Sequence, residues 1–69
     1  MDESDIHPAT QAVLAFFAYE HLPPHLAAVS RPFAKLANDV ATTLAGPEVT
    51  VALRKLLEAK DCAVRAAIA

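Results

Sequence analysis

The stretch VATTLAGPEVTVAL, residues 40–53, decides the fold of this chain, because it holds the Gly46-Pro47 pair. Gly46 is the only glycine in the sequence. A glycine can take the left-handed conformation that ends one helix, and proline is tolerated in the first turn of the next. A connection this short makes the two flanking helices antiparallel neighbours. We therefore expect helices over residues 24–45 and 47–68.

Both flanking segments carry apolar residues at helical spacing, which lays one apolar stripe along each helix. The first stripe consists of Leu22, Leu26, Val29, Phe33, Leu36, Val40 and Leu44, and the second of Val49, Leu53, Leu56, Leu57, Val64, Ala67 and Ile68. We expect the two stripes to face each other. Pro32 lies inside the first stripe, where it lacks a hydrogen-bond donor and its ring clashes with the carbonyl of Ala28. This predicts a kink near residues 30–32.

A third, shorter helix is expected over residues 8–20, between Pro8 and the Pro23-Pro24 turn. Its segment AVLAFFA, residues 12–18, is apolar around the whole helix. Such a helix must be covered on more than one side, and a two-helix hairpin offers only one. Self-association would cover the rest. The alternative is that the helix packs across the hairpin and leaves apolar surface exposed.

The composition agrees with a small all-α protein. The chain has 69 residues, of which 55% are hydrophobic and 20% are charged, and it is rich in alanine, the best helix former. Below about 70 to 80 residues one core seldom supplies more than about 3 to 5 kcal/mol, and disulfides, metals or oligomerisation add the rest. With a single cysteine, we expect oligomerisation. The sequence thus predicts one all-α helical-hairpin domain over residues 1–69, with an acidic, flexible N-terminus over residues 1–7, assembled as a homo-oligomer.

Several classes of function are not expected. The N-terminus is acidic where a secretory signal would be basic, and no apolar run is as long as a membrane span, so we expect a cytoplasmic protein with no membrane partner. The net charge of −2 does not suit duplex nucleic acid. His21 and His25 are spaced like paired metal ligands, but a zinc site needs a third, so we expect no metal. We expect no cofactor and no enzyme activity, because neither a glycine-rich phosphate loop nor paired carboxylates are visible.

The residues that bear most on function are Tyr19, Ser30, Arg31 and Lys35. Arg31 and Lys35 are one turn apart and are expected to point away from the core, and Ser30 adds a hydroxyl at the kink. Tyr19 offers an aromatic face just ahead of a rigid Pro-Pro turn. An aromatic face beside cations is what a nucleotide base and its phosphate require. The alternative is a surface helix beside a tyrosine that binds nothing.

Two charged residues of the last helix also leave alternatives open. Arg65 is four residues after Asp61 and either forms a solvated pair with it or contacts a ligand. Lys60 continues the apolar stripe from Leu53 and Leu56. A lysine there either extends to solvent or meets an anion or a carboxylate of a partner.

Together these residues resemble a known family. The segments FFAYEHLPPHLAAVSRPF (16–33), Leu36-Ala37 and ALRKLLEAKDCAVR (52–65) resemble small proteins of actinobacterial phages. They are similar to the helical-hairpin family of phage anti-CBASS sponges and their Thoeris anti-defence relatives. The resemblance covers most of residues 16–69. It rests on an aromatic-x-Tyr motif, a Pro turn, an early basic residue in the long helix, a Pro-Glu break and an Ala-rich last helix.

The resemblance implies a short first helix across a kinked hairpin, assembled as a hexamer that sequesters cyclic di- and trinucleotides without cleaving them. It implies that Tyr19 stacks on a base and that Arg31, with Ser30 or Lys35, holds phosphate at a protomer interface. It also implies that Arg65 belongs to a second kind of site, for cyclic trinucleotides.

We therefore expect a phage immune-evasion protein that acts in the cytoplasm of the infected bacterial host and blocks CBASS-type antiviral signalling by sequestering its cyclic oligonucleotide messengers. The chain departs from better-known members of the family at Pro32, which follows the candidate basic residue. It departs again at residues 62–65, which replace a Trp-Ala-Asn-like stretch. The alternative function is a small self-assembling helical phage scaffold or adaptor protein with no nucleotide ligand.

Overall fold

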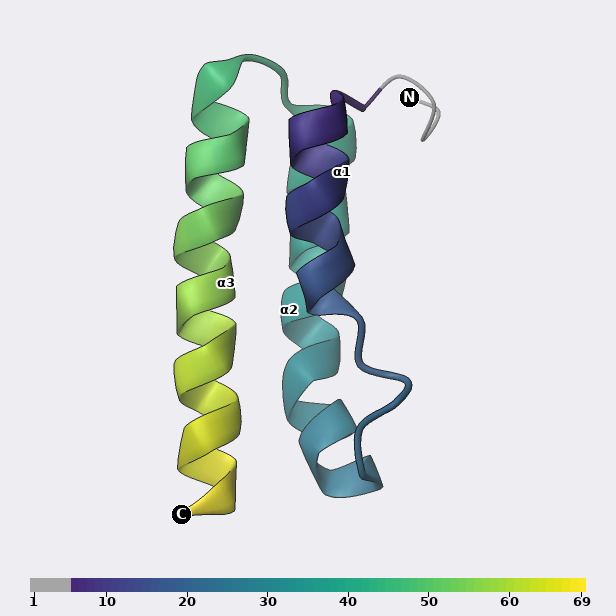
Figure 1. Cartoon of the computed structure of the whole chain (residues 1–69), viewed down its shortest axis with the longest axis vertical. Coiled ribbons are helices and arrows are strands. Elements are labelled where there is room, and N and C mark those ends of the chain that lie inside the picture. Colours follow the sequence, from purple (N-terminus) through teal and green to yellow (C-terminus); the bar gives the residue numbers. More distant parts are fainter. Residues whose placement is uncertain (1–5) are drawn as a thin grey trace.

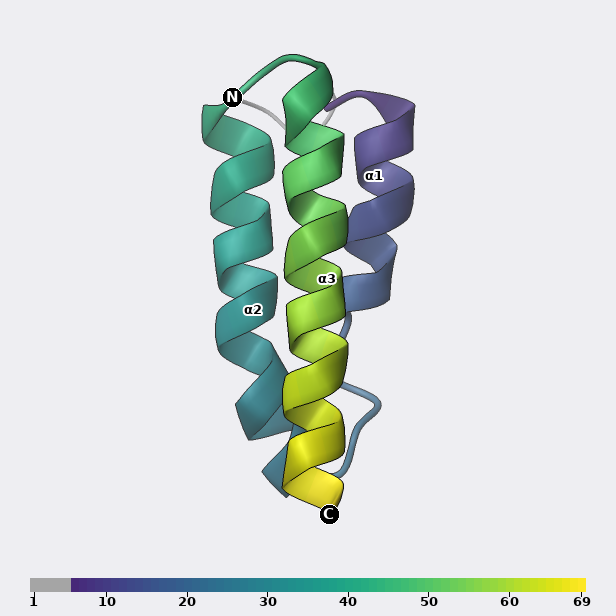
Figure 2. The same ribbon diagram turned by 90° about the vertical axis from the view of Figure 1, so that its left-hand side faces the viewer.

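The computed structural model describes residues 6–69, which form an all-α fold (Figure 1). The elements in chain order are α1 (Pro8–Leu14), the 3-10 helix η2 (Ala15–Phe17), α2 (Pro24–Thr43) and α3 (Pro47–Ile68). α2 and α3 form an antiparallel hairpin, and α1 with η2 packs against it (Figure 2). The predicted fold class and hairpin are confirmed. Within residues 6–69, no helix combines the length and the apolar character needed to cross a bilayer.

The turn of the hairpin lies at the Gly46-Pro47 pair, as the sequence predicts. Gly46 has φ 109° and ψ 171°, a backbone conformation that side-chain-bearing residues rarely adopt. Pro47 is the first residue of α3, and the bounds of this helix agree with the predicted 47–68. α2 ends two residues earlier than the predicted position 45, because Leu44 is already extended, with φ −120° and ψ 157°. The extended Leu44 carries the chain from one helix to the other.

The first helix is shorter than the predicted 8–20. Its α-helical part ends at Leu14 and continues as the tighter η2. Helical structure ends at Ala18, whose φ of −58° and ψ of 137° are extended. A 3-10 turn commonly ends an α-helix in this way. The chain must then turn back to reach Pro24 at the start of α2. Tyr19 therefore lies in the connecting segment and not on a helix.

The N-terminal end of the fold is closed by local contacts. His7 caps α1, because its Nδ1 accepts a hydrogen bond from the Ala9 N–H at 3.1 Å. Ile6 is buried, and its carbonyl accepts from Gln11 Nε2 at 3.0 Å. The predicted flexible N-terminus spans residues 1–7. Its first five residues lie outside the described part of the chain, and Ile6 and His7 belong to the fold.

The core lies where α1 and η2 meet the hairpin. Its buried apolar residues are Ile6, Val13, Phe17, Ala37, Ala41, Val49 and Leu53. The buried face of α2 is centred on small residues such as Ala37 and Ala41, which let the neighbouring helices approach closely. The predicted α2 stripe is therefore rotated: Leu36 is 50% exposed and Leu44 58% exposed. The reason is that α2 must face α1 and η2 as well as α3.

The C-terminal end of α3 is less covered than its sequence pattern predicts. Ile68 is 64% exposed, and Ala67 is exposed as well. Figure 1 shows that α1 and η2 run beside only the half of α3 that lies near the hairpin turn. Ile68 is therefore not covered by α1 or η2.

Pro32 lies inside α2, which remains one helix from Pro24 to Thr43. Figure 2 shows the axis of α2 changing direction within its N-terminal half. A proline there removes one backbone hydrogen bond and pushes against the preceding turn. The bend agrees with the predicted kink.

Candidate functional site

Tyr19 lies at a shallow pocket of about 260 Å³ between the segment that follows η2 and the middle of α2. The lining residues are Leu14, Ala15, Phe17, Ala18, Tyr19, Glu20, Ala34 and Asn38. The side chain of Tyr19 is partly buried. Two hydrogen bonds hold its backbone: its N–H donates to Glu20 Oε2 at 3.2 Å, and its carbonyl accepts from the Leu22 N–H at 3.0 Å.

Arg31 and Lys35 do not line this pocket but lie on the adjoining part of α2. Ala34 and Asn38, which line the pocket, follow Arg31 by three and seven residues, a spacing that places all three on one helix face. Lys35 lies beside Ala34, one turn from Arg31. Both cations are exposed, and neither forms an ion pair with the residues that the structure describes. The fold thus brings Tyr19 to a pocket on α2 beside Ala34 and Asn38, and the two charges lie on neighbouring positions of that helix.

Ser30 is separated from this group. It is fully buried, and its Oγ has no hydrogen-bond partner among residues 6–69. The cause is the rotation of α2 described above, which turns Ser30 toward the core. The expectation that its hydroxyl lies beside Arg31 and Lys35 does not match the structure, in which Ser30 is buried and the two cations are exposed.

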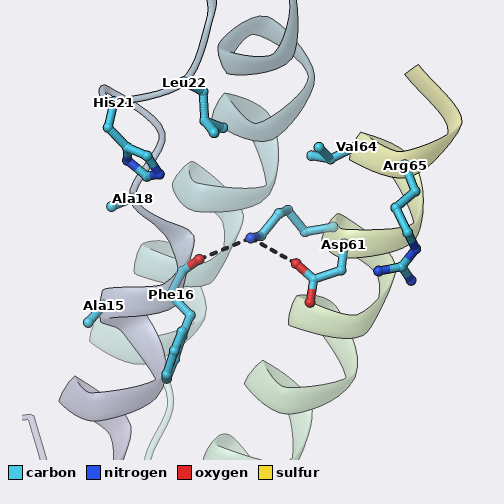
Figure 3. Close-up of a pocket in the computed structure, with 9 residues that line it drawn as sticks. Ala15, Phe16, Ala18, His21, Leu22, Asp61, Val64 and Arg65 are labelled. Atoms are coloured by element: carbon cyan, nitrogen blue, oxygen red, sulfur yellow. Dashed lines mark hydrogen bonds and ion pairs between the residues drawn. The ribbon is translucent and has the colours of Figure 1, made fainter. Parts of the chain in front are cut away.

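Arg65 lies at a second pocket, of about 360 Å³, between α3 and the segment after η2 (Figure 3). The lining residues are Ala15, Phe16, Ala18, His21, Leu22, Lys60, Asp61, Val64 and Arg65. Arg65 Nη2 lies 3.3 Å from Cys62 Sγ. The open alternative of an Asp61–Arg65 pair is not formed, because Asp61 pairs with Lys60 instead. Arg65 and Tyr19 therefore belong to different pockets.

Lys60 is the residue whose role the sequence left most open. Its Nζ donates to the Phe16 carbonyl at 3.0 Å and lies 2.9 Å from Asp61 Oδ1, and its side chain is only 12% exposed. Phe16 is 44 residues away in sequence. No local pattern could have indicated that partner.

The two histidines are not joined in a metal site. His21 lines the pocket of Arg65, whereas His25 is exposed in the first turn of α2. In the described part of the chain, no three His, Cys, Asp or Glu side chains gather as metal ligands would. The polar groups beside Tyr19 are the Glu20 carboxylate and the Asn38 amide. Sequence analysis missed Asn38, because its closeness to Tyr19 depends on how η2 packs on α2.

An aromatic face, an amide and two unpaired cations can together hold a base and a phosphate. Comparison with protein-family models, with curated proteins and with solved structures found no match for this chain. The resemblance to phage sponges therefore stays a prediction from the sequence.

Proposed function

We propose that this protein binds cyclic di- and trinucleotide second messengers and sequesters them without cleavage, as phage anti-CBASS sponges do. In this proposal it acts in the cytoplasm of the infected host and blocks CBASS-type signalling. The observation that supports the proposal is the pocket that Tyr19 shares with Ala34 and Asn38 of α2. The helical spacing puts Arg31 on the same face of α2 as these two residues.

The chemistry of this face suits a cyclic dinucleotide. Stacking of one base on Tyr19 is worth about 1 to 3 kcal/mol. The Arg31 guanidinium can hold a phosphate through paired N–H donors, with Lys35 as a second positive charge. The Asn38 amide offers both a donor and an acceptor to a base edge. Glu20 is held in place by the Tyr19 N–H, and in this proposal it keeps the segment ordered and does not act on the ligand.

The size of the pocket supports the homo-oligomer that the proposal includes. At about 260 Å³ it lies at or below the range of about 300 to 1,000 Å³ that encloses small ligands. A second protomer over the open side would complete the site. Exposed apolar side chains favour such an assembly, among them Phe16, which is 66% exposed. The hexamer is the oligomer that the family resemblance implies.

Ligand binding is tested directly by titration calorimetry with cyclic dinucleotides and a cyclic trinucleotide. The expected result is saturable binding at a fixed ratio per protomer. Ultraviolet absorbance gives a second readout, because the chain has one Tyr and no Trp. Any nucleotide that copurifies would dominate near 260 nm. An intact oligomer that binds no cyclic nucleotide would support the scaffold or adaptor function instead.

Sequestration is distinguished from catalysis by recovering the ligand. The protein is incubated with a cyclic dinucleotide, with and without divalent metal, and then denatured by heat before chromatography of the small molecules. We expect the intact ring in full yield, because a sponge neutralises its ligand stoichiometrically. Linear products that grow with time, and that are absent with Glu20→Ala, would instead indicate an enzyme.

A further inference from the structure

The carbonyl of Phe16 is at the point where the first helical segment ends. In a continuing 3-10 helix it would accept the N–H of Tyr19. The Tyr19 N–H donates instead to the carboxylate of Glu20. The Phe16 carbonyl is thus one of the unpaired acceptors that every helix end leaves.

Lys60 of α3 reaches this carbonyl across the fold (Figure 3). Its ammonium group contacts the Phe16 oxygen at 3.0 Å and the Asp61 carboxylate at 2.9 Å. A cation at the C-terminal end of a helical segment also interacts favourably with the helix dipole. The Lys60 side chain is itself only 12% exposed, although the hydrogen bond lies at the surface beside the exposed Phe16. Lys60 therefore caps a helix that is far from it in sequence.

We propose that Lys60 is a positioning residue for Tyr19. Ala15 and Ala18 line both pockets, so η2 and its exit form the wall between Lys60 on one side and Tyr19 on the other. Five residues, 18–22, separate the capped segment from the Pro23-Pro24 turn. Because this connection is short, the direction in which the chain leaves Phe16 decides where the ring of Tyr19 lies. The functional consequence rests on the proposed function, since it assumes that Tyr19 binds the ligand.

The fluorescence of the single tyrosine tests this directly, without any ligand. Lys60→Met keeps the length of the side chain and removes the ammonium group. We expect acrylamide to quench Tyr19 more strongly in this variant, with a quenching constant shifted toward that of free tyrosine. Lys60→Arg restores a donor and is expected to return the constant toward the parent value. An unchanged constant in Lys60→Met would overturn the proposal.

Two control variants separate positioning from general stability. Lys55→Met changes an exposed lysine of the same helix, which lies 3.8 Å from Glu58, and should leave Tyr19 quenching unchanged. Val49→Ala trims the buried end of the core near the hairpin turn. It should lower the resistance to denaturant without changing quenching in the folded state. Equal quenching changes in Val49→Ala and Lys60→Met would reduce Lys60 to an ordinary stabilising residue and overturn the proposal.

Should Lys60→Met fail to fold, the parent protein still supplies a test. A lysine ammonium group held by two acceptors exchanges its protons slowly, so ¹⁵N-labelled protein should show one protected side-chain ammonium signal from Lys60. Lys35 and Lys55 are exposed and should show none at neutral pH. Absence of the Lys60 signal would overturn the capping contact on which the proposal depends.

Binding of a cyclic dinucleotide to the same variants distinguishes this proposal from the proposed function. If both hold, Lys60→Met weakens binding about tenfold, which equals about 1.4 kcal/mol, and Lys60→Arg recovers most of it. If the parent binds no cyclic nucleotide while the quenching results are as expected, the proposed function fails and the positioning of Tyr19 stands. Parent-like binding by Lys60→Met would overturn the functional part of this inference alone.

Discussion

The hydroxyl oxygens of Thr10 and Thr50 lie 3.2 Å apart and join α1 to the first turns of α3. Thr10 is buried and Thr50 partly buried, so each hydroxyl depends on the other for its hydrogen bond. Neither residue stands out in the sequence. The pair links α1 to α3 beside the core residues Val13 and Val49.

This pair predicts a characteristic double-mutant cycle. Thr10→Val or Thr50→Val alone leaves one poorly solvated hydroxyl without a partner, which costs about 1 to 3 kcal/mol. The double variant removes both hydroxyls at almost constant volume and should recover most of that loss. Denaturant unfolding followed by circular dichroism measures the three free energies. Simple addition of the two single losses would show that the hydroxyls do not interact.

Ser30→Ala should stabilise the protein. The buried Oγ has no partner within residues 6–69, and alanine also has the higher helix propensity, so we expect a gain of about 1 to 2 kcal/mol in the free energy of unfolding. The control is Thr43→Ala, an exposed position in the same helix where the hydroxyl already donates to the Asp39 carbonyl at 2.6 Å. Loss of that hydrogen bond offsets the gain in propensity, so the net gain should not exceed about 0.5 kcal/mol. Affinity for a cyclic dinucleotide should not change. A loss of stability or of affinity in Ser30→Ala would mean that its hydroxyl is bonded in the assembly or to the ligand.

Gly46→Ala should destabilise the hairpin. An added Cβ would meet no atom within 4 Å, but the combination of φ 109° and ψ 171° is strained for an L-residue, at a cost of about 1 to 3 kcal/mol. A chain of 69 residues is accessible to chemical synthesis, which permits a matched control. D-Alanine at position 46 carries the same methyl group and favours positive φ, so it should preserve or raise the melting temperature. Equal losses of stability with L-alanine and D-alanine would show that the backbone conformation of residue 46 is not the cause of the destabilisation.

Tyr19→Ala and Arg31→Ala should each weaken binding of a cyclic dinucleotide at least about tenfold. The expected losses follow from about 1 to 3 kcal/mol for a stacked base and about 1.5 to 3 kcal/mol for a hydrogen bond to a charged group. Arg54→Ala is the control, because Arg54 is an exposed arginine on α3 outside the Tyr19 pocket. Calorimetry measures affinity, and light scattering verifies that the molecular mass in solution equals that of the parent protein. If both variants bind like the parent, the ligand does not use this face.

Arg65→Ala should act on a different ligand. Arg65 lies at the pocket of Lys60 and not at that of Tyr19, so we expect the variant to spare cyclic dinucleotides and weaken a cyclic trinucleotide. Parallel titrations with both ligands measure the two affinities. The opposite pattern would exchange the two site assignments.

The helical spacing of the apolar residues and the Gly46-Pro47 pair were enough to predict the hairpin and the bounds of α3. These features act locally: a positive φ, a proline in a first helical turn and a 3.6-residue period depend on neighbouring residues alone. For the same reason the sequence could indicate Arg31 and Lys35 as residues that point away from the core, and both are exposed.

The tertiary structure decided which residues of each helix are buried and which charges meet. Ser30 turned inward and Leu36 outward because α1 and η2 pack on α2 from one side, a direction that no periodicity encodes. Lys60 contacts the Phe16 carbonyl, which is 44 residues away in sequence, so only the tertiary structure could decide that contact. With the Lys60 ammonium held there, Asp61 pairs with its chain neighbour Lys60 and not with Arg65. Which segments form helices follows from local backbone chemistry. Which side of each helix is buried, and which distant side chain caps the end of η2, follow from long-range packing.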